Sequence, residues 1–578
     1  MRRAKGGKRS STAGLGPRSG RRDRAIVSVA SGLTIAALAV LCSLPSIPKN
    51  AVWTLPVAVL CLLLAAGAAR ALLGESSAEA TGETLTPRWR LLMSSPVVAL
   101  VSVLPFLHSL GVGLLSDDYG ILYGMQETHS LSQAWGRHVL GVFHRPLFSV
   151  WWWLGTRLWQ GVPLGYHIAS LALHSANAVL VFALGKRLIG SRYGAFVAAA
   201  LWAIHPARVE PVTWLACSAD LLCTFFSLLS LLALEVSLTS EARSRRLLAL
   251  AAGVGAFGLA LSSKEAALAL PGVVVLWALL GHRKVTWRAV ALRVGAYGVV
   301  LVAHLVWRLS ALGGFGGYRG IFAWGSALPS TALEHLLGFF LPINVALLDA
   351  VHLAWLRYVL VVVMAAGMFW WVRGLSLLPA WRLRFWVAVF FVISIPIWPL
   401  AGPTSGLENS RLSYLPSIAL AWLFGDLCAG RGIRWRRSGG VAAVTLLLAA
   451  GLSAWYVTTW QQARESADTV IAAGESLVKD LEGQGRFMQI YVDGLPDARL
   501  GAQIFRNCYP QALSLAMGRP APMRAISRQE GAIHPDVIAA SAIFPGEYVA
   551  VWQEKSSSLR IARDGWKSSQ VRPGGGVP

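Results

Sequence analysis

The run YHIASLALHSANAVLVFALGKR, residues 166–187, decides the fold class. No Asp, Glu, Lys or Arg interrupts it before Lys186. A helix needs about 20 mostly apolar residues to cross the hydrocarbon core of a bilayer, and this run supplies that length. It ends in Lys186 and Arg187, and basic residues after an apolar run are typical of the cytoplasmic end of a span. The run therefore predicts a transmembrane helix.

The composition extends this prediction to the whole chain. Of the 578 residues, 55% are hydrophobic and 14% are charged, whereas a soluble domain carries about 25% charged residues. The mean hydropathy is +0.55. The chain also contains 25 Trp residues, and Trp is enriched where spans meet the membrane interface. We therefore expect a multi-pass α-helical membrane protein that contacts membrane lipids.

The net charge is +24, and a strongly basic chain can indicate a nucleic-acid-binding protein. The Lys and Arg residues gather in short loops between apolar runs, which favours the positive-inside pattern and predicts no nucleic-acid partner. The six cysteines form no CxxC motif and no Cys/His metal spacing, so neither a zinc site nor a disulfide framework is expected.

Apolar runs long enough to span a membrane number about thirteen. Residues 1–24 hold nine Lys and Arg and predict a disordered cytoplasmic tail. An N-terminal transmembrane hairpin over 25–73 and an eleven-helix core over 92–459 should follow. The predicted spans are 25–45, 51–73, 92–113, 166–187, 193–209, 212–235, 246–262, 266–281, 288–309, 352–372, 383–400, 412–428 and 439–459. With the tail inside, every inside loop is basic.

The segments predicted on the outer side of the membrane are longer than the inside loops and contain more of the candidate functional residues. Residues 129–160 mix aromatic residues with Arg and His at helical spacing, which predicts helices lying in the interface plane within the outer loop 114–165. Residues 328–342 are a second such candidate. The more polar residues 460–578 predict a small extracytoplasmic α/β domain, with a strand in RFMQIYVDGLP, a turn and helix in PDARLGAQIFRNCYPQAL, and a loose end over 566–578.

Ionisable residues at membrane depth are costly, so each one is a candidate functional residue. Asp117 and Asp118 are the candidate catalytic residues, since a carboxylate in a partly dry pocket can take a proton from an attacking hydroxyl. Arg is suited to binding phosphate because of its fork of donors. The candidate phosphate-binding residues are Arg411, Arg145, Lys264 and Arg308. The residues expected to line the same site are His144, His167, His205, Glu210, Asp220, Glu265 and Tyr414.

Taken in order, SDDYG, the run from HRPLF to KRLIG, HPARVEPVTWLACSADLL, LSSKEAALALPG and ENSRLSYLP resemble the GT-C membrane glycosyltransferases. The resemblance is closest to the protein O-mannosyltransferase-like branch that includes the tetratricopeptide-bearing TMTC proteins. It covers about residues 92–430. It implies a polyprenyl-phosphate sugar donor, an Asp of the acidic motif as general base (Asp117 or Asp118), and Arg411 as a donor-phosphate ligand. The SKE motif implies a phosphate or structural role for Lys264 and Glu265.

The chain departs from that branch in several places. Two spans precede the core, no tetratricopeptide repeats follow it, and Ser218 and Ala219 stand where relatives often carry a basic residue before the Asp. The acceptor is therefore open between a protein, a lipid and a glycan. No metal ligand or cofactor is assigned, although an Asp pair leaves a divalent cation as an alternative.

The expected function is an inverting glycosyltransferase of the plasma or inner membrane, with its N-terminus cytoplasmic and its C-terminal domain extracytoplasmic. It would move a mannose-like sugar from a polyprenyl-phosphate donor to an acceptor hydroxyl. The alternative is a transporter or flippase of a lipid-linked sugar. Transporters often show paired repeats and helices broken near the midplane, and no repeat stands out here, which favours the enzyme.

Overall fold

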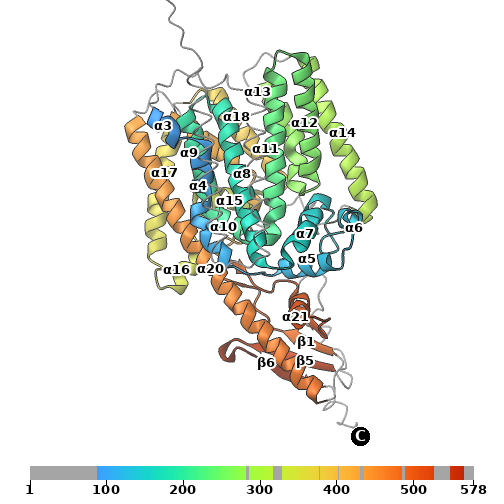
Figure 1. Cartoon of the computed structure of the whole chain (residues 1–578). Helices are drawn as coiled ribbons and strands as arrows, with labels where there is room; N and C mark the ends of the chain where they lie inside the picture. The colour runs from blue at the N-terminus through green and yellow to red at the C-terminus, as the bar shows by residue number, and fades with distance from the viewer. Residues whose placement is uncertain are drawn as a thin grey trace, which may run out of the picture.

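The computed structural model describes residues 87–280, 286–314, 316, 328–375, 378–400, 402–429, 435–484, 489–525 and 547–564. The predicted tail 1–24, the predicted hairpin 25–73 and the predicted loose end 566–578 lie outside the described residues. Figure 1 shows a bundle of helices with a smaller, sheet-containing unit at one end, referred to below as the sheet unit.

The described part of the chain is predominantly helical, which confirms the predicted fold class at that level. Every one of the eleven ranges predicted as core spans contains a helix. The helices of the bundle are α3 (Pro87–Leu92), α4 (Ser95–Val103), η3 (Leu104–Gly111), α8 (Pro163–Ile189), α9 (Arg192–Ile204), η4 (Pro206–Arg208), α10 (Val209–Thr213), η5 (Leu215–Cys217), α11 (Ser218–Thr239), α12 (Arg243–Leu261), η6 (Glu265–Ala269), α13 (Leu270–Leu280), α14 (Trp287–Leu312), α15 (Leu328–Phe340), α16 (Val345–Ala350), α17 (Leu356–Leu375), α18 (Ala380–Ser394), η7 (Ser410–Ser413), α19 (Ser417–Ala429) and α20 (Trp435–Gly483).

Within the described residues, five helices are long and apolar enough to cross a membrane. They are Pro163–Ile189, Leu215–Thr239, Arg243–Leu261, Trp287–Leu312 and Ala442–Gly483. Shorter apolar helices include Arg192–Ile204 and Ser417–Ala429. A membrane protein is therefore supported, while the number of crossings and their direction stay predictions.

Local sequence explains where the helix α8 begins and ends. Pro163 occupies its first turn, where a missing N–H costs nothing and the fixed φ suits a helix. Gly190 ends it in the left-handed conformation at φ 75°, which glycine adopts without strain. Ser191 then caps α9, since its hydroxyl accepts the Gly194 N–H at 3.1 Å. Two helices are thus joined by a very short turn and pack as neighbours.

The helices α9 and α19 approach closely because glycines face each other across the contact. A Cβ added to Gly194 would lie 2.5 Å from the carbonyl oxygen of Gly425, and a Cβ added to Gly425 would overlap the carbonyl oxygen of Gly194. In apolar surroundings such small residues let two backbones pack by van der Waals contact.

We expect Gly425→Ala to destabilise the protein, since its methyl group would meet backbone atoms that cannot rotate away. Overpacking of this kind costs about 1–3 kcal/mol. The matched control is Gly451→Ala on the exposed face of α20, where nothing lies within 4 Å of the added methyl group. Thermal unfolding in detergent should show a lower Tm for Gly425→Ala and an unchanged or higher Tm for the control. Equal Tm values would contradict the close contact.

Three short helices lie at the end of the bundle nearest the sheet unit: α5 (Asp117–Gln126), α6 (Leu131–Gly136) and α7 (Pro146–Trp159). The last two fall in the stretch predicted to form interfacial helices, and α15 falls in the second predicted stretch. These segments are therefore helical, as expected. Their orientation relative to a membrane plane stays a prediction.

The sheet unit contains both strands and a helix. Its four-stranded sheet has the order β4 (Met523–Ala525), β1 (Gln489–Asp493), β5 (Glu547–Gln553) and β6 (Ser558–Asp564). The strand β1 pairs in parallel with both β4 and β5, and β6 pairs antiparallel with β5. The remaining elements are the two-stranded ribbon β2 (Ala498–Arg499) and β3 (Ala502–Gln503), the helix α21 (Tyr509–Met517) and the short turn η8 (Glu554–Ser556).

One helix connects the bundle to the sheet unit. The last predicted span ends at residue 459 and the predicted outer domain begins at 460, yet α20 continues without a break to Gly483. Its buried side chains recur every three to eight residues beyond that point, at Ala463, Ala467, Val470, Val478 and Leu481. These residues join the same hydrophobic cluster as Ile490 and Val492 of β1. The sheet unit thus packs against the apolar face of α20.

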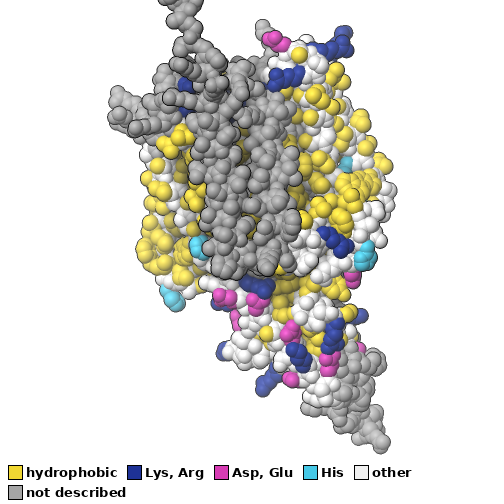
Figure 2. Space-filling model, viewed as in Figure 1, with side chains coloured by type: hydrophobic (Ala, Val, Ile, Leu, Met, Phe, Trp, Pro, Cys, Tyr) yellow, Lys and Arg dark blue, Asp and Glu magenta, His cyan; other side chains and the backbone are white. Residues whose placement is uncertain are grey.

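The surface agrees with this division. Figure 2 shows hydrophobic side chains over much of the described surface of the bundle. Asp, Glu, Lys and Arg gather instead on the sheet unit and at the far edge of the bundle (Figure 2). A wide apolar surface on the bundle is what contact with lipid requires.

Candidate functional site

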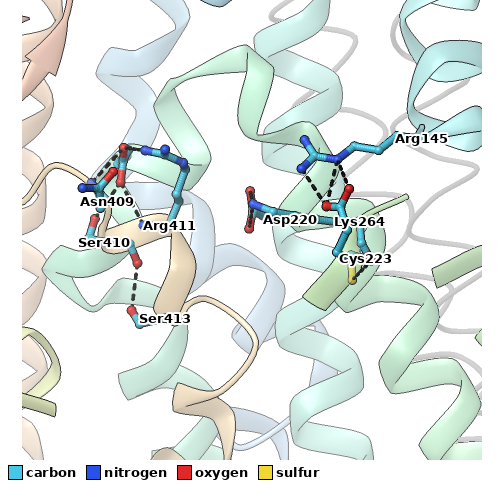
Figure 3. A network of polar contacts seen from close by, with 10 residues as sticks. Arg145, Asp220, Cys223, Lys264, Asn409, Ser410, Arg411 and Ser413 are labelled. Carbon is cyan, nitrogen blue, oxygen red and sulfur yellow. Dashed lines mark hydrogen bonds and ion pairs between the residues drawn. The ribbon is translucent and has the colours of Figure 1, made fainter. Parts of the chain in front are cut away.

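Three groups of mostly buried ion pairs lie at the end of the bundle nearest the sheet unit. Figure 3 shows the Asp220–Lys264 pair between the turn that carries Arg411 and the side chain of Arg145. All four predicted phosphate-binding residues belong to these groups, and each one contacts a carboxylate. We refer to the three groups together as the charge row.

The first group is built around Glu210 at the start of α10. Its carboxylate accepts the backbone N–H of Arg411 at 2.8 Å and that of Asn409 at 3.2 Å, and it pairs with the Arg411 guanidinium. The same guanidinium lies 5.2 Å from the centre of the Trp214 ring. Glu210 therefore fixes the η7 turn and, through that turn, the direction of Arg411.

The second and third groups meet at the turn between α12 and η6. The Lys264 ammonium donates to both carboxylate oxygens of Asp220 at 2.6 Å, and both side chains are less than one-tenth exposed. Next to it, Glu265 accepts from Arg145 at 2.7 Å and from Arg308 at 2.9 Å. Burial alone would raise the pKa of Glu265, but the two guanidiniums hold that pKa at about 2. Glu265 therefore stays ionised and keeps both arginines in place.

The two neighbouring aspartates of α5 have different surroundings. Asp118 is 1% exposed, and its two oxygens accept the backbone N–H groups of Leu115 at 3.0 Å and Ala216 at 2.7 Å. The preceding residue, Ser116, has φ 48° and ψ −118°, which is strained for a residue with a side chain. Asp118 thus stabilises an unusual turn, and that turn sets the position of Asp117.

Asp117 is the less enclosed of the two. Its Oδ1 accepts a hydrogen bond from Asn507 at 2.8 Å. Burial raises its pKa above 3.8, while Asn507, Arg411, Arg506 and Arg145 act in the opposite direction. The pKa of Asp118 is raised further, again by burial first. Asp117 is thus a carboxylate of raised pKa in the field of three arginines.

The histidines and the tyrosine predicted to line the site occupy other positions. His205 bonds the carbonyl of Phe339 at 2.9 Å and caps η4 by accepting the Ala207 N–H. Tyr414 points into the core, where its hydroxyl contacts His174 at 2.7 Å. His167 is fully buried beside the backbone of Val112 and Gly113. The structure does not bring these three side chains into the charge row.

His144 lies beside the charge row rather than in it. Its ring packs edge-on against Trp307 at 4.5 Å, and its carbonyl accepts a hydrogen bond from Arg308 at 3.4 Å. Burial, together with His138, His304 and Arg308, lowers its pKa to about 4, although Glu265 acts in the opposite direction. A neutral imidazole therefore stands next to the paired arginines.

Three polar residues near the site carry no clear signal in the sequence. Asn507 and Arg506 lie in the segment before α21, far along the chain from Asp117. Arg208, between the prolines of HPARVEP, is fully buried, and its Nη2 donates to Ser417 at 3.0 Å. Its Nε and Nη1 have no hydrogen-bond partner among the described residues. The only sequence feature that singles out Arg208 is its position between Pro206 and Pro211.

The described residues contain no group of three or more His, Cys, Asp or Glu side chains arranged to hold a metal ion. Asp117 and Asp118 do not form such a group with a third ligand, because the oxygens of Asp118 face backbone amides.

Parts of the chain are similar to known protein O-mannosyl-transferases. No family model matches the chain. The chain is 29% identical over 151 residues to a protein O-mannosyl-transferase of Caenorhabditis elegans, which is 24% of this chain and 22% of that protein. It is 46% identical over 59 residues to protein O-mannosyl-transferase Tmtc1 of Drosophila melanogaster, 10% of this chain and 7% of that protein. It is 32% identical over 114 residues to protein O-mannosyl-transferase TMTC2 of Homo sapiens, 20% of this chain and 13% of that protein.

These relatives confirm the predicted resemblance to the TMTC-like O-mannosyltransferase branch. They support a membrane glycosyltransferase as the class of protein. The chain matches less than a quarter of the length of each of these relatives. Its own reaction is therefore a matter for the proposal that follows.

Proposed function

We propose that the protein is an inverting glycosyltransferase that transfers a mannose-like sugar from a polyprenyl-phosphate donor to an acceptor hydroxyl. The observation that carries this proposal is the position of Asp117 at the start of α5, where its Oδ1 accepts from Asn507 and its carboxylate lies in the field of Arg145, Arg411 and Arg506. A base beside cations is the arrangement that a hydroxyl attacking a phosphate-linked sugar requires. The relatives named protein O-mannosyl-transferases support the same reaction class.

The proposed chemistry is a single displacement. The acceptor oxygen forms a bond to the anomeric carbon of the sugar while Asp117 removes the hydroxyl proton. The bond between that carbon and the phosphate oxygen breaks, and its electron pair leaves with the polyprenyl phosphate. Arg411 and the Arg145–Arg308 pair neutralise the negative charge that develops there, as guanidiniums do for phosphate groups. The leaving group is stable as an anion, so it needs little acid assistance.

The proposed orientation follows the loop charges. Lys186, Arg187 and the other loop cations mark one end of the bundle as cytoplasmic by the positive-inside rule. The charge row and the sheet unit then face the extracytoplasmic side of a plasma or inner membrane. A polyprenyl donor would enter from the outer leaflet and the acceptor from the water.

The experiment is a reconstituted transfer assay. The purified protein in liposomes would receive polyprenyl-phosphate mannose with a radiolabelled sugar and a pool of Ser- and Thr-rich peptides. We expect release of polyprenyl phosphate together with a labelled product, and loss of both in Asp117→Asn. Release that is unaffected by Asp117→Asn would contradict the proposed base.

The same assay separates the enzyme from a transporter. A transporter of lipid-linked sugar would move the intact donor across the bilayer and release no polyprenyl phosphate. Intact transfer of the donor without cleavage would therefore replace this proposal with the transporter.

A further inference from the structure

We propose that residues 504–508, which precede α21 in the sheet unit, form part of the active site, with Asn507 positioning the Asp117 carboxylate for the acceptor and Arg506 adding positive charge near it. This inference rests on the proposed function and extends it to a part of the chain outside the helical core. It assigns the sheet unit a role in the reaction itself.

Several contacts dock this segment onto the start of α5. The backbone N–H of Ser116 donates to the carbonyl of Ile504 at 2.8 Å. The Tyr119 and Phe505 rings stack with their centres 6.0 Å apart. A Cβ added to Gly120 would overlap the Sγ of Cys508, so the helix and the segment touch without space between them. The segment therefore holds the strained turn that precedes Asp117.

One side chain of the segment, Asn507, reaches the Asp117 carboxylate. Asn507 donates from Nδ2 to Oδ1 of Asp117 at 2.8 Å, which leaves Oδ2 as the oxygen available to an acceptor. Asn507 is exposed and Asp117 is partly exposed, so this contact lies at the edge of the site that water reaches. A bulky acceptor arriving from the water would meet this edge first.

The charged and titratable groups around Asp117 come from four parts of the chain. Asp118 is its neighbour on α5, Arg145 precedes α7, Arg411 belongs to η7, and Arg506 and Cys508 belong to the docked segment. The positive charge of Arg506 also acts to lower the pKa values of Glu408 and Asp497, which belong to other loops. Removing Arg506 or the Asn507 hydrogen bond therefore raises the pKa of Asp117. Since the base works in its deprotonated form, the acidic limb of the rate profile should move to higher pH.

The test uses the full chain in liposomes with polyprenyl-phosphate mannose, and compares kcat from pH 5 to pH 9 for Asn507→Ala, Arg506→Gln and Arg506→Lys. We expect about a tenfold loss for Asn507→Ala and for Arg506→Gln at the acidic end, a smaller loss at pH 9, and recovery of the profile in Arg506→Lys because the charge returns. A merely structural role would lower the rate equally at every pH.

The matched control is Arg519→Gln, which removes an exposed arginine of the same unit that pairs with Glu482 at 2.6 Å. Its pH profile should stay that of the wild type. Docking is checked by Gly120→Ala, which should lower Tm, and by Gly120→Ala with Cys508→Ala, which should recover part of the loss because the sulfur is removed while Leu140 stays 3.0 Å away. Wild-type profiles for both Asn507→Ala and Arg506→Gln would overturn this inference, even where Asp117→Asn is inactive and the proposed function stands.

Discussion

Replacing Asp117 by Asn is expected to lower kcat by about 10²- to 10⁴-fold, the usual contribution of a general base. Asn has the shape of Asp and can still accept the hydrogen bond from Asn507, so the fold should survive. What it lacks is the ability to take the proton of the acceptor hydroxyl. The measurement is the rate of polyprenyl-phosphate release at saturating donor, with Tm as the check on folding.

Asp118→Asn is the control, and its effect should be of another kind. The Asp118 carboxylate accepts two backbone N–H groups, from Leu115 and Ala216, while an amide offers only one acceptor oxygen. One buried N–H then faces an NH₂ group, which costs about 1–3 kcal/mol. We expect a lower Tm and less folded protein, with much of the rate retained per folded molecule. An inactive but fully stable Asp118→Asn, beside an active Asp117→Asn, would reverse the two roles.

The pH dependence of the wild type follows from the same carboxylate. Burial raises the pKa of Asp117 above its ordinary value of 3.8. The base is active when it is deprotonated, so transfer should be maximal above this raised pKa and should fall as the pH drops through it. This acidic limb should be absent from any residual activity of Asp117→Asn. A profile that falls with rising pH in the same range would contradict the assignment.

The helices could be predicted from the sequence because their cause is local. Runs such as 166–187 carry enough apolar residues to require burial or lipid, and Pro163 and Gly190 mark where one of them begins and ends. Hydropathy does not predict the continuation of α20 past residue 459, because the later apolar residues of this helix are spaced among charged ones and the average covers both. Only the sheet on which they pack shows that those residues are buried.

The chemistry of the site was predictable only as a set of residue types. The sequence identifies two aspartates and several arginines but not which aspartate faces the backbone. That choice depends on the amide of Ala216, 98 residues away, and the contact with Asn507 spans 390 residues. Tyr414 shows that a residue type suited to a site can lie outside it. The sequence predicts that Tyr414 lines the site, yet the short η7 turn directs it toward His174 in the core.

Arg411→Gln should raise the KM for the polyprenyl-phosphate donor by about 10- to 100-fold, because a charge-assisted hydrogen bond to phosphate contributes about 1.5–3 kcal/mol. The substitution leaves Glu210 bound to the backbone N–H groups of Asn409 and Arg411, so the η7 turn keeps its anchor. The measurement is the donor dependence of polyprenyl-phosphate release. The KM of Arg411→Lys should lie between those of the wild type and Arg411→Gln, because an ammonium keeps the charge but lacks the fork of the guanidinium.

Arg382→Gln is the matched control for this substitution. Arg382 also pairs with a buried carboxylate, Asp426, but it lies beside the last residue of α8, where it donates to the Ile189 carbonyl at 3.1 Å. Removing it leaves Asp426 with the Trp386 indole N–H at 3.0 Å and should lower Tm without changing the KM for the donor. If the two substitutions changed KM equally, loss of a buried ion pair would explain both, and Arg411 would not be a phosphate ligand. A selective rise in KM for Arg411→Gln would instead tie the charge row to the donor, since Arg382 lies outside the charge row, beside the last residue of α8.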